Sequence, residues 1–443
     1  MGVDRKLGAW IAAAAVLLVG WTAPATADID IQHWRTEQGA RVYFVPTHEL
    51  PMVDVRVVFD AGAARDHGQP GLAVMTNHML MQGAGGLSAD AIAARLEDVG
   101  ASVGKGAERD MAWLSLRSLT DPELLDPALE TVARVLGNPD FPKEDLERER
   151  QRTLVALEQQ QESPSEVAQE ALYEAVFREH PYAHDPLGTA ESVRNLSRED
   201  LQKFYGQFYT ARNAVIAIVG DLDRAAAEAM AERLVAGLEP GEAAPALPAV
   251  PALTEPSERR IDHPSTQSHV RLGQPGIRRG ADDYFALYVG NHALGGGGLV
   301  SLLMEEVREK RGLSYSVYSY FLPMARKGPF VLGMQTRNDQ VDEGLKVLRE
   351  TLRQFVDQGI SEQQLEQAKK NIIGGFPLRI DSNQDQVQYL AAIGFYDLPL
   401  DYLDRFPERI EAVTREDVQR AFRAHVKPER MAVVVVGGDN RGG

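Results

Sequence analysis

Two segments of the chain repeat one pattern 217 positions apart, and this repeat limits the possible folds more than any other feature. The first copy begins at residue 197 with SREDLQK and continues to the apolar run AVIAIV at 214–219. The second begins at residue 414 with TREDVQR and continues to MAVVVV at 431–436. A Ser or Thr followed by acidic residues is typical of a helix start, and a short apolar run of a buried strand. Each half of the chain is therefore predicted to close with a helix and then a buried strand.

A proline-rich segment at 239–257 separates the two copies. It contains five prolines and shows neither helical nor strand periodicity, which is typical of an extended, semi-rigid linker. With 443 residues and 44% hydrophobic content, the chain also exceeds what one core normally organises. We therefore predict two homologous domains at 28–238 and 258–443. Helices interleaved with strands favour an α+β fold, with a mainly antiparallel sheet covered by helices on one face in each domain.

The first 27 residues have the three parts of a secretory signal peptide. Arg5 and Lys6 precede an apolar run at 7–21, and Ala-Thr-Ala at 25–27 is a typical cleavage site. An uncleaved anchor is the alternative, but the run is shorter than the roughly 20 residues that a spanning helix needs. No later segment is predicted to span a membrane, and the absence of cysteine excludes disulfides and lipoprotein attachment. The mature chain is expected to be soluble and periplasmic, or otherwise exported.

The charge of the chain argues against nucleic acid as a partner. The net charge is −17 and the pI is near 5.1, whereas proteins that bind phosphate backbones present a basic surface. Nothing in the sequence provides such a surface.

The segment at 71–80, GLAVMTNHML, is predicted to be a short apolar helix. Positions 74 and 78 lie on one helix face, at the spacing with which two histidines could share a zinc ion. An H-x-x-E-H zinc peptidase would need His at 74, Glu at 77 and His at 78. The sequence has Val74, Asn77 and His78, so only the last of the three remains. A single histidine on an apolar helix is more typical of a packing residue than of a metal ligand.

Two further segments have the outward form of a binding motif. His180 and His184 are four residues apart, but Pro181 disfavours a regular helix through both, so we predict no metal pair there. The glycine-rich segment NHALGGGG at 291–298 is predicted to be a loop before a helix at 299–310. It lacks the Lys and Ser/Thr of a phosphate-binding loop, and its glycines fit close backbone packing or a hinge better.

Taken in order, five segments resemble the pitrilysin or insulinase family of zinc peptidases, which includes the mitochondrial processing peptidases and exported bacterial relatives. They are GLAVMTNHML at 71–80, HPYAHDPLG at 180–188, FYTARNAVIAIVGD at 208–221, LGGGGLVSLLMEEVREKRGLSYSVYS at 294–319 and IEAVTREDVQRA at 410–421. The resemblance covers nearly all of the mature chain. It implies that the two domains form a clamshell half.

The resemblance also implies where zinc ligands would lie. Active members hold zinc with both histidines of H-x-x-E-H and with a Glu on a later helix, which matches 147–161 here. If Glu149 corresponds to the first of two family glutamates seven residues apart, Ala156 occupies the ligand position. Glu158 lies close by, but even with it the site would have only His78 and one carboxylate. We therefore expect no metal site and no catalytic residue in this chain alone.

In the second half, Arg308 and Tyr315 match the Arg and Tyr that the family's second domain turns towards the zinc site of the first. The resemblance implies that they bind substrate and stabilise the developing oxyanion. Some family peptidases consist of two chains, one with the zinc motif and one with the Arg and Tyr. This chain resembles the second kind, so zinc is expected in a homologous partner chain.

Three functions are consistent with the sequence. The first is a catalytically incomplete subunit of a heterodimeric zinc metallopeptidase that encloses peptides together with its partner. The second is an exported peptide-binding or scaffold protein that uses the same clamshell without hydrolysis. The third is a lone peptidase with unusual ligands. Arg308 and Tyr315 favour the first over the second, because a binding protein has no particular need of that pair.

Overall fold

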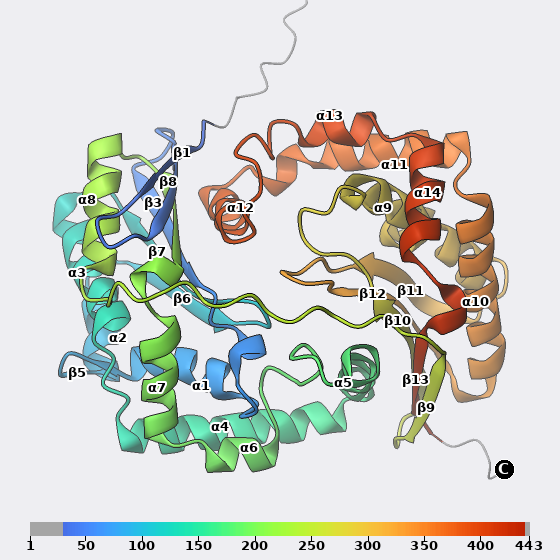
Figure 1. Ribbon diagram of the computed structural model, residues 1–443, viewed down its shortest axis with the longest axis horizontal. Coiled ribbons are helices and arrows are strands. Elements are labelled where there is room, and N and C mark those ends of the chain that lie inside the picture. The colour runs from blue at the N-terminus through green and yellow to red at the C-terminus, as the bar shows by residue number, and fades with distance from the viewer. Residues whose placement is uncertain (1–29, 439–443) are drawn as a thin grey trace, which may run out of the picture.

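The computed structural model describes residues 30–438, and each half of the chain contains one large sheet (Figure 1). The N-terminal sheet has the strand order β1-β2-β8-β3-β7-β6, and the C-terminal sheet has the order β11-β12-β10-β13-β9. The strands are β1 Gln32–Arg35, β2 Arg41–Pro46, β3 Met52–Phe59, β6 Ser102–Ala107, β7 Ala112–Leu119, β8 Ala214–Gly220, β9 Ser257–Asp262, β10 Gln267–Pro275, β11 Ser314–Phe321, β12 Pro329–Arg337 and β13 Ala432–Gly437, with the short pair β4 Gly83–Ala84 and β5 Leu87–Ser88 beside them. The predicted signal peptide lies outside the described residues.

The two sheets repeat one topology. The order β2-β8-β3-β7-β6 in the first half corresponds to β9-β13-β10-β12-β11 in the second. In each sheet the closing strand pairs in parallel with the first of these strands, β8 with β2 and β13 with β9, and the other pairs are antiparallel. The predicted α+β fold with two homologous units is confirmed.

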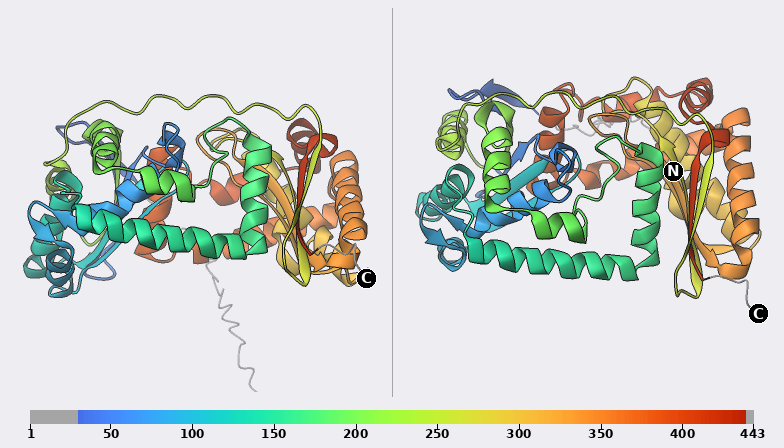
Figure 2. Two further views of the ribbon diagram at one scale, coloured as in Figure 1. Left: turned by 90° about the horizontal axis from the view of Figure 1, so that it is seen from below. Right: turned by 60° about the horizontal axis from the view of Figure 1, so that its bottom comes forward.

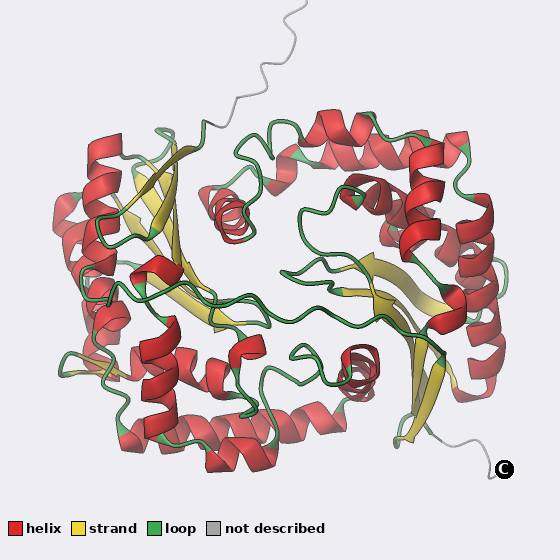
Figure 3. Ribbon diagram, viewed as in Figure 1, coloured by secondary structure: helices red, strands yellow, loops and turns green. Residues whose placement is uncertain are grey.

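Helices form the outer layers of both halves (Figure 3). The main helices are α1 Leu72–Met79, α2 Ala89–Glu97, α3 Pro122–Gly137, α4 Lys143–Glu162, α5 Pro164–Phe177, α6 Ala190–Asn195, α7 Arg198–Phe208, α8 Arg224–Val235, α9 Tyr284–Asn291, α10 Val341–Gln358, α11 Glu362–Gly375, α12 Asn383–Phe395, α13 Phe406–Glu411 and α14 Arg415–His425. The repeated segments begin α7 and α14 with capping boxes, in which Ser197 and Thr414 bond Asp200 and Asp417. The predicted helix starts are confirmed.

The closing strands β8 and β13 are buried along their whole length because both of their faces are covered. In β8, Ile216 and Ile218 face the core under the N-terminal helices, while Val215, Ala217 and Val219 belong to the core of the other half. In β13 the residues alternate between two cores in the same way. Uniformly apolar strands require this covering on both faces.

The helix that covers the second face of each sheet comes from the opposite half. Helix α12, of the C-terminal half, packs on β8, β3 and β2, and α5, of the N-terminal half, packs on β10 and β13. Figure 2 shows α4 running from the N-terminal half to α5, which stands beside the C-terminal sheet. The sequence predicted helices on one face of each sheet. The structure adds a helix on the second face, which each half receives from the other.

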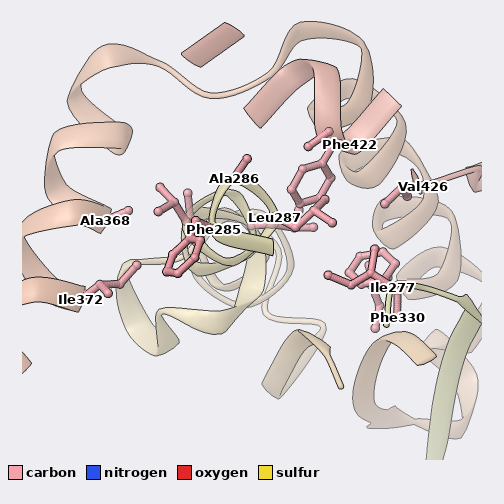
Figure 4. Packing of buried hydrophobic residues seen from close by; sticks show 14 of the residues in the cluster. Ile277, Phe285, Ala286, Leu287, Phe330, Ala368, Ile372, Phe422 and Val426 are labelled. Atoms are coloured by element: carbon pink, nitrogen blue, oxygen red, sulfur yellow. The ribbon is translucent and has the colours of Figure 1, made fainter. Parts of the chain in front are cut away.

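The core of the C-terminal half lies between its sheet and α9, α10, α11 and α14. Phe285 and Leu287 of α9 pack in this core near Ala368 and Ile372 of α11 and Phe422 of α14 (Figure 4). Burial of a large apolar side chain of this kind stabilises the fold by about 1.5–3 kcal/mol.

A buried carboxylate ties the two halves together. Asp110 lies in the turn between β6 and β7 and is 4% exposed. It accepts hydrogen bonds from the hydroxyls of Tyr182 (2.5 Å) and Tyr396 (3.0 Å) and from the backbone N–H of Ala325 (2.7 Å). Two of the three donors belong to the C-terminal half, so this turn is fixed against both halves.

Residues 236–256 connect the halves without forming a helix or a strand. The segment is held by hydrogen bonds from both sides, since Leu247 O accepts from Arg326 Nε (2.6 Å) and Pro248 O lies 3.1 Å from His180 Nε2. In Figure 2 it follows the outside of the molecule from one half to the other.

The exchange predicts opposite effects for two glycine substitutions in helices. At Gly394 in α12, an added Cβ would lie 2.5 Å from the Tyr43 ring and 2.6 Å from Val215, whereas at Gly374 in α11 nothing lies within 4 Å. Gly374→Ala should stabilise the chain by about 0.5–1 kcal/mol, because alanine favours helix. Gly394→Ala should destabilise it by about 1–3 kcal/mol despite the same gain in propensity. Urea denaturation measures both changes, and stability changes of the same sign would contradict the packing described.

Candidate functional site

Helix α1 is held at its N-terminus by one buried carboxylate. Asp66 Oδ2 accepts from Gly71 N and Oδ1 accepts from Ala73 N, both at 2.8 Å. Gly71 has φ +94°, a conformation that a residue with a Cβ rarely adopts. His184 Nε2 lies 3.1 Å from Asp66 Oδ2 and so belongs to the same support. The start of the predicted helix at 71–80 is thus fixed by Asp66, which precedes it, and by His184 from a distant segment.

The two replaced motif positions on α1 are both buried. Val74 is 5% exposed, and Asn77 is fully buried. The Asn77 amide donates from Nδ2 to the backbone carbonyl of Trp113 on β7, at 3.2 Å. An amide has no useful proton affinity, so Asn77 cannot act as a general base.

His78 lies beside one cation and one carboxylate, Lys105 on β6 and Glu149 on α4. The pKa of His78 is lowered to about 4, mainly by burial and also by the charge of Lys105, while Glu149 opposes the change. Burial also lowers the pKa of the Lys105 ammonium. Glu149 is buried and accepts hydrogen bonds from Gln82 Nε2 (3.2 Å) and Arg152 Nη1 (2.5 Å). The charge of Glu149 is therefore already compensated by protein groups.

These donors do not fit zinc. Catalytic zinc takes three protein ligands, whereas His78 and Glu149 offer at most two, and the positive charge of Lys105 acts on His78 as well. Ala156 offers no donor, and Glu158 is exposed on another face of α4. Between residues 30 and 438, no group of three or more His, Asp or Glu side chains is arranged to hold a metal ion.

A cavity of about 350 Å³ lies beside the incomplete zinc motif of α1. His78 and Val74 line it together with the carboxyl groups of Glu166, Glu170 and Asp185. Asp185 Oδ2 accepts from Gln160 Nε2 at 2.5 Å, and burial raises the pKa of Glu170. The surroundings of His78 are therefore polar and carry charges of both signs, because Arg109 lines the same cavity as these carboxyl groups.

His180 and His184 have separate partners. His180 Nδ1 accepts from Tyr182 N at 3.1 Å, so its Nε2 carries the proton donated to Pro248 O. His184 Nε2 faces Ala63 O and Asp66. These hydrogen bonds give both rings structural roles in holding the connecting segment and α1.

In the C-terminal half the glycine-rich segment differs from the prediction. The expected loop at 291–298 instead continues α9 as a π-helical stretch, His292–Gly296. The expected helix at 299–310 is a 3₁₀ turn, Gly298–Val300, followed by a second π-helical stretch, Met304–Glu309. The close approach of Gly295 to Ser319, where a Cβ would lie 2.5 Å from the hydroxyl, explains one of the glycines.

The structure brings Arg308 and Tyr315 together. The Arg308 guanidinium carbon lies 4.5 Å from the centre of the Tyr315 ring. Tyr315 is 81% exposed, because the pairing of β11 with β12 shifts register between Ser314 and Ser316 and leaves residue 315 without a partner. Tyr315 lines a cavity of about 610 Å³, whereas His78 lines the separate cavity of the N-terminal half.

Two features of the structure were not identified from the sequence, the lysine near His78 and the carboxylate that joins the two halves. Lys105 lies between glycines in SVGKGA, where nothing distinguishes it from a solvated lysine. Asp110 and its tyrosine partners come from three distant segments, and no local spacing signals their contact.

Comparison with known proteins agrees with this fold. The family model "Insulinase (Peptidase family M16)" matches residues 41–190, and "Peptidase M16 inactive domain" matches residues 195–372. A crystal structure of a peptidase M16 inactive domain from Pseudomonas fluorescens is 40% identical, has a TM-score of 0.90 and covers 93% of this chain and 98% of its own. A protease from Helicobacter pylori has a TM-score of 0.84 at 19% identity over 92% of this chain and 99% of its own, which shows a shared fold.

Among curated relatives, a "Non-peptidase homolog YmxG" of Helicobacter pylori is 26% identical over 408 residues, which cover 89% of this chain and 91% of that protein. The chain belongs to the M16 peptidase family, also called the insulinase family. The residues at the zinc motif make it a catalytically incomplete member. No helix within residues 30–438 has the length and apolar character needed to cross a membrane.

The environment of His78 predicts a pH-dependent stability. The unfolded chain binds a proton at this imidazole near pH 6.5, whereas the folded chain binds it only near pH 4. Stability should therefore fall as pH falls from about 6.5 to 4, by about 2 kcal/mol at pH 5 from this group alone. Urea denaturation of the wild type and His78→Gln between pH 7 and pH 5 isolates the effect, since the variant lacks the group. Parallel stability curves would contradict the burial of a neutral His78.

Proposed function

We propose that this chain is the non-zinc subunit of a heterodimeric M16 metallopeptidase and supplies Arg308 and Tyr315 to the zinc site of a homologous partner chain. One observation carries the proposal, namely that Tyr315 is 81% exposed on a strand irregularity beside Arg308, although the zinc motif of the same chain retains only His78. An exposed tyrosine of this kind contributes little to stability. Its position is easier to explain by contact with a substrate.

The chemistry of the pair suits a peptide bond under attack. The Arg308 side chain makes no ion pair or hydrogen bond within residues 30–438, so its guanidinium donors remain available to a substrate carbonyl. The Tyr315 hydroxyl adds a donor next to them. Such donors stabilise the oxyanion that forms when water attacks the carbonyl carbon, and the zinc and the base that activate the water would belong to the partner.

The partner and the location follow from the same reasoning. A chain whose own donors do not fit zinc needs a second chain with H-x-x-E-H for hydrolysis. The predicted signal peptide at 1–27 supports an exported, periplasmic place for both. Peptides enclosed between the two subunits would be the substrates.

A second function has one specific observation in its favour. The Helicobacter pylori relative is named a non-peptidase homolog. An exported protein of this kind would hold peptides in the clamshell, or act as a scaffold, without hydrolysis. Retention of the Arg308–Tyr315 pair favours the peptidase subunit.

An activity assay with a reconstituted pair tests the proposal. The chain alone should not cleave an unstructured peptide, whereas the chain with a homologue carrying H-x-x-E-H should, and a chelator should abolish cleavage. Arg308→Ala or Tyr315→Phe should lower kcat by roughly 10²–10³-fold, since each removes an oxyanion donor.

Lys310→Ala is the matched control for these variants. Lys310 is an exposed cation two residues from Arg308 that pairs with Glu305 and Glu306, so its loss should leave turnover unchanged. Cleavage by the chain alone would refute the subunit assignment. Full turnover of the Arg308 and Tyr315 variants in an intact pair would show that these residues have no catalytic role.

A further inference from the structure

Two cavities in the C-terminal half adjoin one another. The first, of about 610 Å³, lies between α9 and β11, and the second, of about 670 Å³, lies between α9 and α12. Arg279, Tyr284 and Tyr288 line both cavities. The two therefore form one continuous binding surface that begins at Tyr315 and ends on the exchanged helix.

Arg279 lies at the junction, on the segment between β10 and α9 that extends towards α12 in Figure 1. Its guanidinium carbon lies 5.4 Å from the centre of the Tyr396 ring. Within residues 30–438 the side chain makes no ion pair and no hydrogen bond, and its Nε is buried without a partner. A buried donor without an acceptor costs free energy, which a ligand with an acceptor would recover.

The groups around Arg279 also favour an anion. Arg379 lines the second cavity and donates from Nη1 to the Tyr288 hydroxyl at 2.5 Å. Asp385 is the carboxylate among the lining residues, and it is engaged with Ser382 at the start of α12. The cavities are therefore lined by two guanidinium groups and by one carboxylate that is already hydrogen-bonded. This local excess of positive charge contrasts with the net charge of −17 of the whole chain.

The remaining lining is aromatic and apolar. Besides the shared tyrosines it includes Tyr389, Tyr402 and Phe321, and the exposed side chains of Leu299 and Leu378 lie at its edges. Such a surface accepts the side chains of a peptide, while a planar guanidinium suits a carboxylate.

We propose that the Arg279 site binds a carboxylate of a peptide, either an acidic side chain or the C-terminus, within the chamber. The proposal rests on the peptide-enclosing role proposed above and adds a requirement for a carboxylate on the peptide. It assigns Arg279 a substrate-binding role distinct from that of Arg308 and Tyr315.

Peptide selection by the full chain tests this site. A random-sequence peptide library is passed over the immobilised protein once with free C-termini and once with amidated C-termini, and the retained peptides are sequenced. Asp and Glu should be enriched over Asn and Gln, or free C-termini over amides. A retained peptide is then synthesised with Glu or Gln and with a carboxylate or an amide, and its affinity is measured by fluorescence polarisation.

The wild type should lose roughly tenfold in affinity when the recognised carboxylate is neutralised, whichever of the two it is. Arg279→Gln should bind all versions with similar affinity. Arg278→Gln is the matched control, because Arg278 is the exposed neighbour outside both cavities and its loss changes the net charge equally. Arg279→Gln should change the melting temperature only slightly, since the side chain has no hydrogen bond to lose and gives up only its contact with the Tyr396 ring.

Equal affinity of the wild type for all four versions, retention of no peptide, or unchanged discrimination in Arg279→Gln would each overturn the proposal. Discrimination lost equally in Arg278→Gln would do the same, since it would show an effect of net charge. The outcome is separable from that of the proposed function. Carboxylate-dependent binding without hydrolysis by the pair would refute the peptidase role alone, and hydrolysis without such discrimination would refute only the Arg279 site.

Discussion

The fold depends on closing strands that are apolar on both faces. Strands β8 and β13 cannot leave either face in water, and the helices of their own half cover only one. Helices α12 and α5 cover the other by crossing to the opposite half. The exchange places α12 next to the C-terminal cavities and α5 next to the cavity over His78. One hydrophobic requirement thus determines which helices border these cavities.

The loss of the zinc site is a coordinated change of several groups. Val74 is packed, Asn77 is bonded to the backbone of β7, and the charge of Glu149 is balanced by Lys105 and Arg152. Restoring one ligand would therefore leave the others mismatched. In the second half, Arg308 and Arg279 contact the rings of Tyr315 and Tyr396, and within residues 30–438 neither side chain makes an ion pair or a hydrogen bond.

Local patterns in the sequence were sufficient for the starts of α7 and α14 and for the buried strands that follow them, because helix caps and apolar runs depend on neighbouring residues. They could not predict the exchange, since the apolar face of α12 indicates that the helix is buried but not on which sheet. The exposure of Tyr315 depends on a register shift that the strand pattern does not encode. The glycine-rich segment was predicted as a loop, but it continues α9 as a π-helical stretch in which Gly295 lies close to Ser319. Arg308 and Tyr315 themselves were selected by family resemblance, and their catalytic role stays a prediction.

The crossing helices make the chain resemble two swapped protomers joined end to end. The polypeptide passes between the halves at α4 and α5, again along 236–256, and again at α11 and α12. A single cut by a protease in the exposed connecting segment would leave the other crossings in place, so the two fragments would remain interlocked. The covalent link at 236–256 therefore contributes less to holding the two halves together than the crossing helices do. Two separately synthesised fragments would be expected to assemble into the same clamshell half.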